Sequence, residues 1–221
     1  MIQAVVFDLD DTLFPEHQFV MSGFHAVGQH VKVWFGVDGF FEQAECLFSA
    51  GNRGTIFNRA LEQLGIDPKP SVITTLLSVY REHRPQIELY EDARWAMAFF
   101  GQSWKTGIIT DGFLVTQRNK VRALGIESRF GIVLYTDEYG REGWKPSPIS
   151  YQKVMEALSC SGPECVYIAD NPVKDFVAAR KLGWKTIQLR RKGGEYSNLV
   201  AQVGYEADFT VESLYDLREL I

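Results

Sequence analysis

Three acidic residues and a threonine follow a short apolar run at the start of the chain, in the order Asp8, Leu9, Asp10, Asp11, Thr12. A continuous apolar run of this length is typical of a strand buried on both faces of a parallel sheet. Ligands of such sheets bind beyond the carboxyl ends of the strands, so Asp8 and Asp10 are expected to face a substrate. Because crowded carboxylates repel each other, the pair indicates a divalent metal. The alternative is an acidic loop that caps a helix.

A second polar cluster, Thr110-Asp111-Gly112, ends the apolar run 106–110. A hydroxyl followed by a glycine-containing turn into a helix offers an O–H and backbone N–H groups to an anion. Thr110 or Asp111 would serve equally well as the N-cap of the next helix. Both interpretations stay open on the residues alone.

A single lysine, Lys145, marks the third cluster, after the predicted strand 132–135. It precedes Pro146, which is expected to start the next helix and to fix the backbone there. A fixed ammonium group would neutralise a phosphoryl oxygen. Since lysine is most often exposed, a solvated surface charge is the alternative.

The fourth cluster, Asp170 to Asp175, follows the apolar run 165–169. Asp170 would complete an oxygen-only site of the kind that Mg²⁺ prefers. An N-cap role for Asp170 or Asn171 is the alternative.

The elements that must position these clusters alternate between strands and helices after residue 92. Strands are predicted at 106–110, 132–135, 165–169 and 186–189, with helices at 92–100, 114–124, 148–158 and 173–182. This alternation predicts an α/β fold with a doubly wound parallel sheet. An edge strand at 208–211 and a last helix at 212–220 are also predicted, and 190–192 is expected to be a solvated loop.

Residues 14–88 contain no strand pattern. Four amphipathic helices separated by glycine and proline breaks are predicted instead. The predicted organisation is a core of residues 1–13 and 89–221 with an all-helical insert at 14–88. Because the insert begins at the strand end that carries Asp8 and Asp10, it is expected to act as a lid.

Composition restricts the partners and the compartment. The chain has 221 residues, 46% of them hydrophobic, and a net charge of −5, which argues against nucleic-acid and anionic-membrane binding. Three cysteines without close spacing indicate reduced thiols and a cytoplasmic protein. No signal peptide and no run long enough to cross a bilayer is evident.

The four clusters, in this order and each at a strand end, resemble the motifs of the haloacid dehalogenase superfamily of aspartate-nucleophile phosphohydrolases. The resemblance covers essentially the whole chain. It assigns Asp8 to Thr12 to the first motif, Thr110 to the second, Lys145 to the third, and Asp170 with Asp175 to the fourth. It implies a Rossmann-like core of strand order 5-4-1-2-3 and a helical cap of the family's first cap type.

The resemblance also implies a mechanism. Asp8 would attack phosphorus, and Asp10 would protonate the leaving oxygen and then activate water. Mg²⁺ would be held by Asp8, Asp170 and the backbone carbonyl of Asp10. Thr110, Asp111 and Lys145 would bind the substrate. Asp175 would orient metal-bound water or Lys145, and Thr12 would contact the residues that bind the metal and the substrate.

Asp10 favours a phosphatase, because the family's true dehalogenases lack an acid at that position and need no magnesium. Asp111 departs from the family's usual asparagine, so its side chain is expected to point away from the phosphate or to pair with a cation such as Arg118. Glu16, at the root of the insert, and Arg53, between its helices, are candidates for contacting the rest of the substrate.

The predicted function is thus a Mg²⁺-dependent phosphatase for a small phosphorylated metabolite, such as a sugar phosphate or a phosphoglycolate-like compound, acting as a monomer or homodimer. A phosphomutase of the same superfamily and a non-catalytic binding module are the alternatives. The substrate itself is not determined by the sequence, because residues of the insert would select it.

Overall fold

The computed structural model describes all residues, 1–221, and the chain divides into two compact units. Unit 1 comprises residues 1–16 and 88–221, and unit 2 comprises residues 17–87. Each unit has its own packed interior and is described by itself. No helix combines the length and the apolar character needed to cross a membrane.

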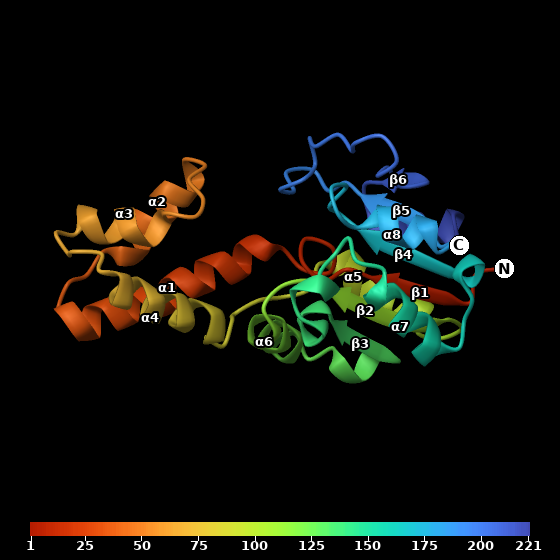
Figure 1. Ribbon diagram of the computed structural model, residues 1–221, viewed down its shortest axis with the longest axis horizontal. Coiled ribbons are helices and arrows are strands. Elements are labelled where there is room, and N and C mark those ends of the chain that lie inside the picture. Colours follow the sequence, from red (N-terminus) through yellow and green to blue (C-terminus); the bar gives the residue numbers. More distant parts are fainter. The chain divides into compact units, whose positions relative to one another are not determined.

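Unit 1 is built on one parallel sheet of six strands in the order β3-β2-β1-β4-β5-β6 (Figure 1). The strands are β1 (Ala4–Phe7), β2 (Lys105–Thr110), β3 (Ile132–Tyr135), β4 (Cys165–Ala169), β5 (Lys185–Leu189) and β6 (Phe209–Val211). The predicted α/β class is confirmed. The predicted order of five strands is present, and the predicted edge strand at 208–211 extends it as β6, which pairs in parallel with β5.

Strand β1 lies in the interior of the sheet, between β2 and β4. Its four residues are fully buried, as expected for a strand covered on both faces. The Phe7 ring packs against Phe100 and Phe130, each with ring centroids 6.3 Å apart. The residue that follows β1 therefore leaves the sheet from a rigid base.

Helices α5 (Glu91–Phe100), α6 (Leu114–Leu124), α7 (Ile149–Leu158) and α8 (Phe176–Lys181) connect the strands. Three predictions about these helices and the last one were wrong. Helix α8 starts at Phe176 and not at residue 173, because the Asn171 side chain accepts the Val173 N–H at 2.9 Å and closes a turn there. Residues 214–219 form a 3₁₀-helix in place of the predicted α-helix.

The third wrong prediction concerns Pro146, which does not start a helix. Helix α7 begins three residues later, at Ile149. Pro146 instead lies in a turn that the Ser147 N–H closes on the Trp144 carbonyl at 2.9 Å. Lys145 is consequently held by tertiary contacts and not by an adjoining helix.

Unit 2 is entirely helical. Its helices are α1 (Glu16–Phe35, whose first residue belongs to unit 1), α2 (Phe40–Ser49), α3 (Ile56–Gln63) and α4 (Pro70–Glu82). Their apolar faces form one core that includes Phe24, Val27, Phe40, Leu61 and Leu76. Gly23 lets α1 approach α4 closely, since a Cβ at this position would meet the Tyr80 ring at 2.4 Å.

A buried ion pair ties the segment after β5 to the start of α5. The Arg191 guanidinium donates to both carboxylate oxygens of Asp92, at 2.8 and 2.9 Å, and to the Thr12 carbonyl at 3.0 Å. Asp92 also accepts from Ser213 and from the Leu214 N–H. The expectation that 190–192 is a solvated loop is therefore wrong for Arg191, because its side chain is only 14% exposed.

We predict that Asp92→Asn lowers the free energy of unfolding by about 1.5–3 kcal/mol at neutral pH, since charge-assisted bonds are lost. Burial opposes ionisation of Asp92, but Arg191 and the Leu214 N–H outweigh it and hold its pKa below the ordinary 3.8. This contribution is present above about pH 4 and is lost as the pH falls through the lowered pKa.

Urea denaturation at about pH 7 and about pH 3 measures both effects. The difference between wild type and Asp92→Asn should shrink at the lower pH. Glu91→Gln, in the same helical turn but exposed, is the matched control and should change stability little. An equal loss for Asp92→Asn at both pH values would contradict the role of the charge.

Candidate active site

Asp8 extends directly from β1 and is anchored to the neighbouring strand. Its N–H donates to the Ile168 carbonyl of β4 at 2.8 Å, so its backbone continues the sheet. The residue is 7% exposed. Donors from Lys145 and Tyr167 bond its Oδ1, and no donor of the chain bonds Oδ2. One carboxylate oxygen is thus fixed, and the other is available to a ligand.

Lys145 provides the positive charge beside Asp8. Its Nζ donates to Asp8 Oδ1, to the Tyr167 hydroxyl at 2.6 Å and to Asp175 Oδ1 at 2.8 Å. The side chain is fully buried. Burial alone would lower the pKa of Lys145, but Asp175 and Asp8 raise it well above the ordinary value. Lys145 is therefore a fixed ammonium group, and the alternative of a solvated surface charge is excluded.

Asp175 is held behind Lys145. Its Oδ2 accepts the Asn171 N–H at 3.1 Å, while its own backbone carbonyl accepts the Tyr151 hydroxyl at 2.7 Å. Tyr151 and Tyr167 pack edge to face with ring centroids 5.2 Å apart. These contacts leave Asp175 only 1% exposed. Asp175 thus orients the ammonium group without facing solvent.

Burial raises the pKa of the Asp8 carboxyl to about 7; Lys145 opposes this rise, whereas Asp175 and Asp10 add to it. The pKa of Asp170 is raised well above its ordinary value by burial and then by the charges of Asp8 and Asp175. A cation bound between Asp8 and Asp170 would lower both values, because it favours the ionised carboxylates.

The donor set at this place fits a hard cation held partly by backbone. Asp170 is 9% exposed, and no donor of the chain bonds its carboxylate. No three acidic, histidine or cysteine side chains converge as a metal site. The predicted ligand set needs only two side chains, Asp8 and Asp170, and takes a carbonyl from Asp10. Carboxylate and carbonyl oxygens suit Mg²⁺, which keeps several waters.

The Asp10 side chain turns toward helix α6. Its Oδ1 accepts from Lys120 Nζ and its Oδ2 from Gln117 Nε2, both at 2.6 Å. Gln117 Nε2 also lies 2.6 Å from the Thr110 hydroxyl. The side chains of Asp10 and Thr110, from different strand ends, are thus joined through one residue of α6.

The Asp111 carboxylate is occupied by three donors. Its Oδ1 accepts from the Thr136 hydroxyl at 2.8 Å and from the Lys145 N–H at 3.0 Å, and its Oδ2 pairs with Lys174 at 2.8 Å. The predicted pairing of Asp111 with a cation is confirmed, but the choice of Arg118 was wrong: the cation is Lys174, and Arg118 bonds Glu138 at 2.7 Å. Burial opposes the charge, but Lys174 and Lys145 lower the pKa of Asp111, so it stays ionised.

Neither Thr110 nor Asp111 caps α6. The Leu114 N–H donates instead to Asp137 at 2.9 Å. The N–H groups of Asp111 and Gly112 have no acceptor within the chain. They and the Thr110 hydroxyl remain suited to an anion. The capping alternative applies to Asp11, whose carboxylate accepts the Glu16 N–H at the start of α1 at 2.9 Å.

The remaining candidates lie in different surroundings. Thr12 is fully buried and its hydroxyl has no partner in the chain. Glu16 lies 3.5 Å from Lys120 Nζ, with its side chain 42% exposed. Arg53 belongs to unit 2, where it donates to the Phe48 carbonyl at 3.0 Å and covers the Phe48 ring.

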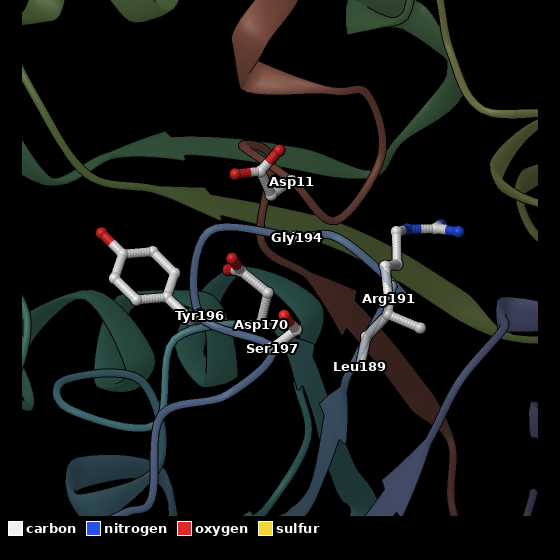
Figure 2. A pocket seen from close by; sticks show the side chains of 7 residues that line it. All are labelled: Asp11, Asp170, Leu189, Arg191, Gly194, Tyr196 and Ser197. Atoms are coloured by element: carbon white, nitrogen blue, oxygen red, sulfur yellow. The ribbon is translucent and has the colours of Figure 1, made fainter. Parts of the chain in front are cut away.

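The segment after β5 forms part of the lining of a pocket beside Asp170. The pocket is lined by Asp11, Asp170, Leu189, Arg191, Gly194, Tyr196 and Ser197. Figure 2 shows the Asp11 and Asp170 carboxylates and the Tyr196 ring around this space, with the Arg191 guanidinium extending away from it. The pocket therefore offers carboxylate and hydroxyl groups but no cation from Arg191.

Sequence reasoning missed Gln117, Lys120, Lys174 and Tyr167. Gln117 and Lys120 stand three apart on a predicted helix, a spacing that puts both on one face. Lys174 stands beside Asp175 within the fourth cluster. Tyr167 carried no signal, because an aromatic residue in a buried strand is most often part of the core.

Comparison with known proteins identifies the family of the chain. Residues 5–189 match the family model described as haloacid dehalogenase-like hydrolase. A glyceraldehyde 3-phosphate phosphatase from Methanocaldococcus jannaschii is 27% identical over 100% of this chain and 97% of its own length. The pyrophosphatase PpaX from Halalkalibacterium halodurans is 24% identical, with 100% of this chain and 97% of that protein covered.

Among solved structures, a HAD phosphatase from Thermococcus onnurineus has the same fold. The TM-score is 0.65 at 23% identity, with 99% of this chain and 97% of that one covered. The family match spans more than half of the chain and includes β1 to β5. The predicted superfamily is confirmed: the chain belongs to the haloacid dehalogenase-like hydrolases.

Proposed function

We propose that this protein is a Mg²⁺-dependent phosphatase that hydrolyses a small phosphorylated metabolite through an aspartyl-phosphate on Asp8. The observation that carries the proposal is the buried contact of Asp8 with Lys145, with a second acid, Asp10, two residues further on. An anionic nucleophile meets an anionic substrate only where fixed positive charge compensates both.

The proposed reaction has two chemical steps, and Asp10 takes part in both. Asp8 Oδ2 attacks phosphorus, the bond from phosphorus to the leaving oxygen breaks, and Asp10 gives that oxygen its proton. Asp10 then takes a proton from the water that attacks the aspartyl-phosphate, which frees phosphate and restores Asp8. The Lys145 ammonium, the Thr110 hydroxyl and the N–H groups at 111–112 hold the phosphoryl oxygens.

Mg²⁺ would be held by Asp8, Asp170 and the Asp10 carbonyl. When bound, it neutralises charge on the nucleophile and the phosphoryl group. The raised pKa values of Asp8 and Asp170 support this assignment, because they reflect buried negative charge without enough compensation.

The substrate class is a small phosphorylated metabolite. The two relatives are named for activity on glyceraldehyde 3-phosphate and on pyrophosphate, which are both small. We assign unit 2 the role of a cap that helps to select the substrate, since it is inserted directly after the strand that leads to Asp8 and Asp10. Three unpaired cysteines suit a reducing compartment such as the cytoplasm.

The first test is Asp8→Asn, which should abolish turnover and leave the fold intact, because the amide has the same shape but does not attack phosphorus. Phosphate release from 4-nitrophenyl phosphate with Mg²⁺ measures the loss, and circular dichroism checks the fold. Activity above a few per cent of wild type, with deamidation excluded by mass spectrometry, would reject Asp8 as the nucleophile. Equal release of phosphate and alcohol from the wild type separates a phosphatase from a phosphomutase.

Asp170→Ala should raise the Mg²⁺ concentration needed for half-maximal activity by at least about tenfold, since a hard cation loses a carboxylate ligand. Mg²⁺ should also raise the melting temperature of the wild type more than that of the variant, because the cation binds only the folded site. Asp67→Ala, at an exposed carboxylate of unit 2, is the control. Coincident magnesium titrations of wild type and Asp170→Ala would exclude Asp170 as a ligand.

Lys145→Ala and Lys145→Arg should both lose activity. A guanidinium is larger and planar, and it does not replace a compact ammonium within reach of Asp8, Tyr167 and Asp175. Initial rates with saturating Mg²⁺ measure this. Normal turnover by Lys145→Arg would show that only a diffuse positive charge is needed there.

A further inference from the structure

Helix α6 presents two buried polar side chains to Asp10. Lys120 donates to Oδ1 and Gln117 to Oδ2, each at 2.6 Å. Each of the two residues is 2% exposed. The Asp10 side chain itself retains 19% exposure, so it is held from within and still faces solvent on one side.

Burying a lysine is unfavourable unless a partner neutralises it. Burial opposes the charge of Lys120, but Asp10 and Glu16 more than compensate and raise its pKa above the ordinary value. The contacts with Asp10 and Glu16 thus compensate the buried ammonium group of Lys120. Its distance to Glu16 Oε1 is 3.5 Å, so the shorter contact is to Asp10.

We propose that Lys120 and Gln117 are positioning residues that fix the Asp10 carboxyl group for proton transfer to the leaving oxygen. This inference rests on the proposed phosphatase function and adds two residues to it. Two donors on different oxygens define the plane of the carboxyl group, and each oxygen keeps a second lone pair, one of which carries the proton that passes to the leaving oxygen. The exposed side of Asp10 is then directed toward the substrate's leaving group.

Proton transfer in a transition state is sensitive to position. A well-placed general acid contributes about 10²–10⁴-fold to the rate, and an error of about 1 Å removes much of this. Without Lys120 or Gln117 the Asp10 carboxyl group is free to rotate. The loss should be confined to substrates whose leaving oxygen needs a proton.

The alternative is that Lys120 and Gln117 merely pin α6 to the segment after β1. A structural role of this kind would reduce activity equally for every substrate. Leaving-group dependence separates the two roles, because 4-nitrophenoxide leaves without a proton, whereas phenoxide is a much poorer leaving group. The two aryl phosphates otherwise have nearly the same shape and charge.

The experiment measures kcat/KM for 4-nitrophenyl phosphate and for phenyl phosphate with saturating Mg²⁺. The ratio of the two values does not depend on how much of a preparation is folded. We compare wild type with Lys120→Met, Gln117→Leu and Asp10→Asn. Arg118→Met, on the same helix and with an exposed side chain, is the matched control.

The ratio of kcat/KM for 4-nitrophenyl phosphate to kcat/KM for phenyl phosphate should rise by about tenfold in Lys120→Met and in Gln117→Leu. It should rise by about a hundredfold in Asp10→Asn, where the acid is lost completely. Arg118→Met should stay within about twofold of wild type. Gln117→Leu also removes the donor to Thr110. This second loss affects both substrates equally, so it does not contribute to the rise in the ratio.

An unchanged ratio in Gln117→Leu and Lys120→Met would overturn the inference, whether or not both rates fall. If Lys120→Met yields no soluble protein, Gln117→Leu decides alone. Failure of the proposed function is distinguishable, because the wild type would then hydrolyse neither aryl phosphate, or Asp8→Asn would retain activity.

Discussion

The arrangement at the edge of the sheet depends on one buried ammonium group. Lys145 satisfies Asp8 and Asp175 at once, and without it two carboxylates would be buried against each other. Removing one partner of such a group leaves an uncompensated charge, which is strongly destabilising. The need to keep this charge in place explains why Asp8, Asp175 and Tyr167 all contact the Lys145 ammonium group, while the Asp111 carboxylate accepts the Lys145 backbone N–H.

Lys145 compensates only part of the buried negative charge at this edge of the sheet, and the charge that remains favours the binding of a cation. Burial raises the pKa of Asp8 to about 7 and that of Asp170 well above its ordinary value. A site with surplus buried negative charge attracts a hard cation, which then prepares it for an anionic substrate. The same electrostatics would account for metal binding, the ionised nucleophile and the selection of phosphoryl groups.

Helix α6 links the phosphate-binding strand end to the acid. Gln117 reaches both Thr110 and Asp10, while Lys120 reaches Asp10 from the next turn. Because both side chains are on one rigid helix, a shift of the helix would move both groups together. The structure thus couples the residue proposed to hold the phosphoryl oxygens to the residue proposed to protonate the leaving oxygen.

Local patterns along the chain determined much of this protein. The apolar runs before Asp8, Thr110 and Asp170 predicted buried parallel strands, and the carboxyl ends of such strands share one edge. The all-helical character predicted for residues 14–88 followed from periodicity, whereas the five-strand order followed only from the resemblance to the family. The helix and strand patterns depend on residues near each other in sequence, which is why the sequence alone was sufficient to predict these elements.

Tertiary structure decided which charges meet. Lys174 and not Arg118 neutralises Asp111, Arg191 is buried against Asp92, and Asp10 is held by Lys120, which is 110 residues away in sequence. An ion pair forms where packing brings two side chains within about 4 Å, and no local pattern encodes that distance. The sequence thus determined the sheet and the strand ends that carry the acids, and only packing decided which cation neutralises each of them.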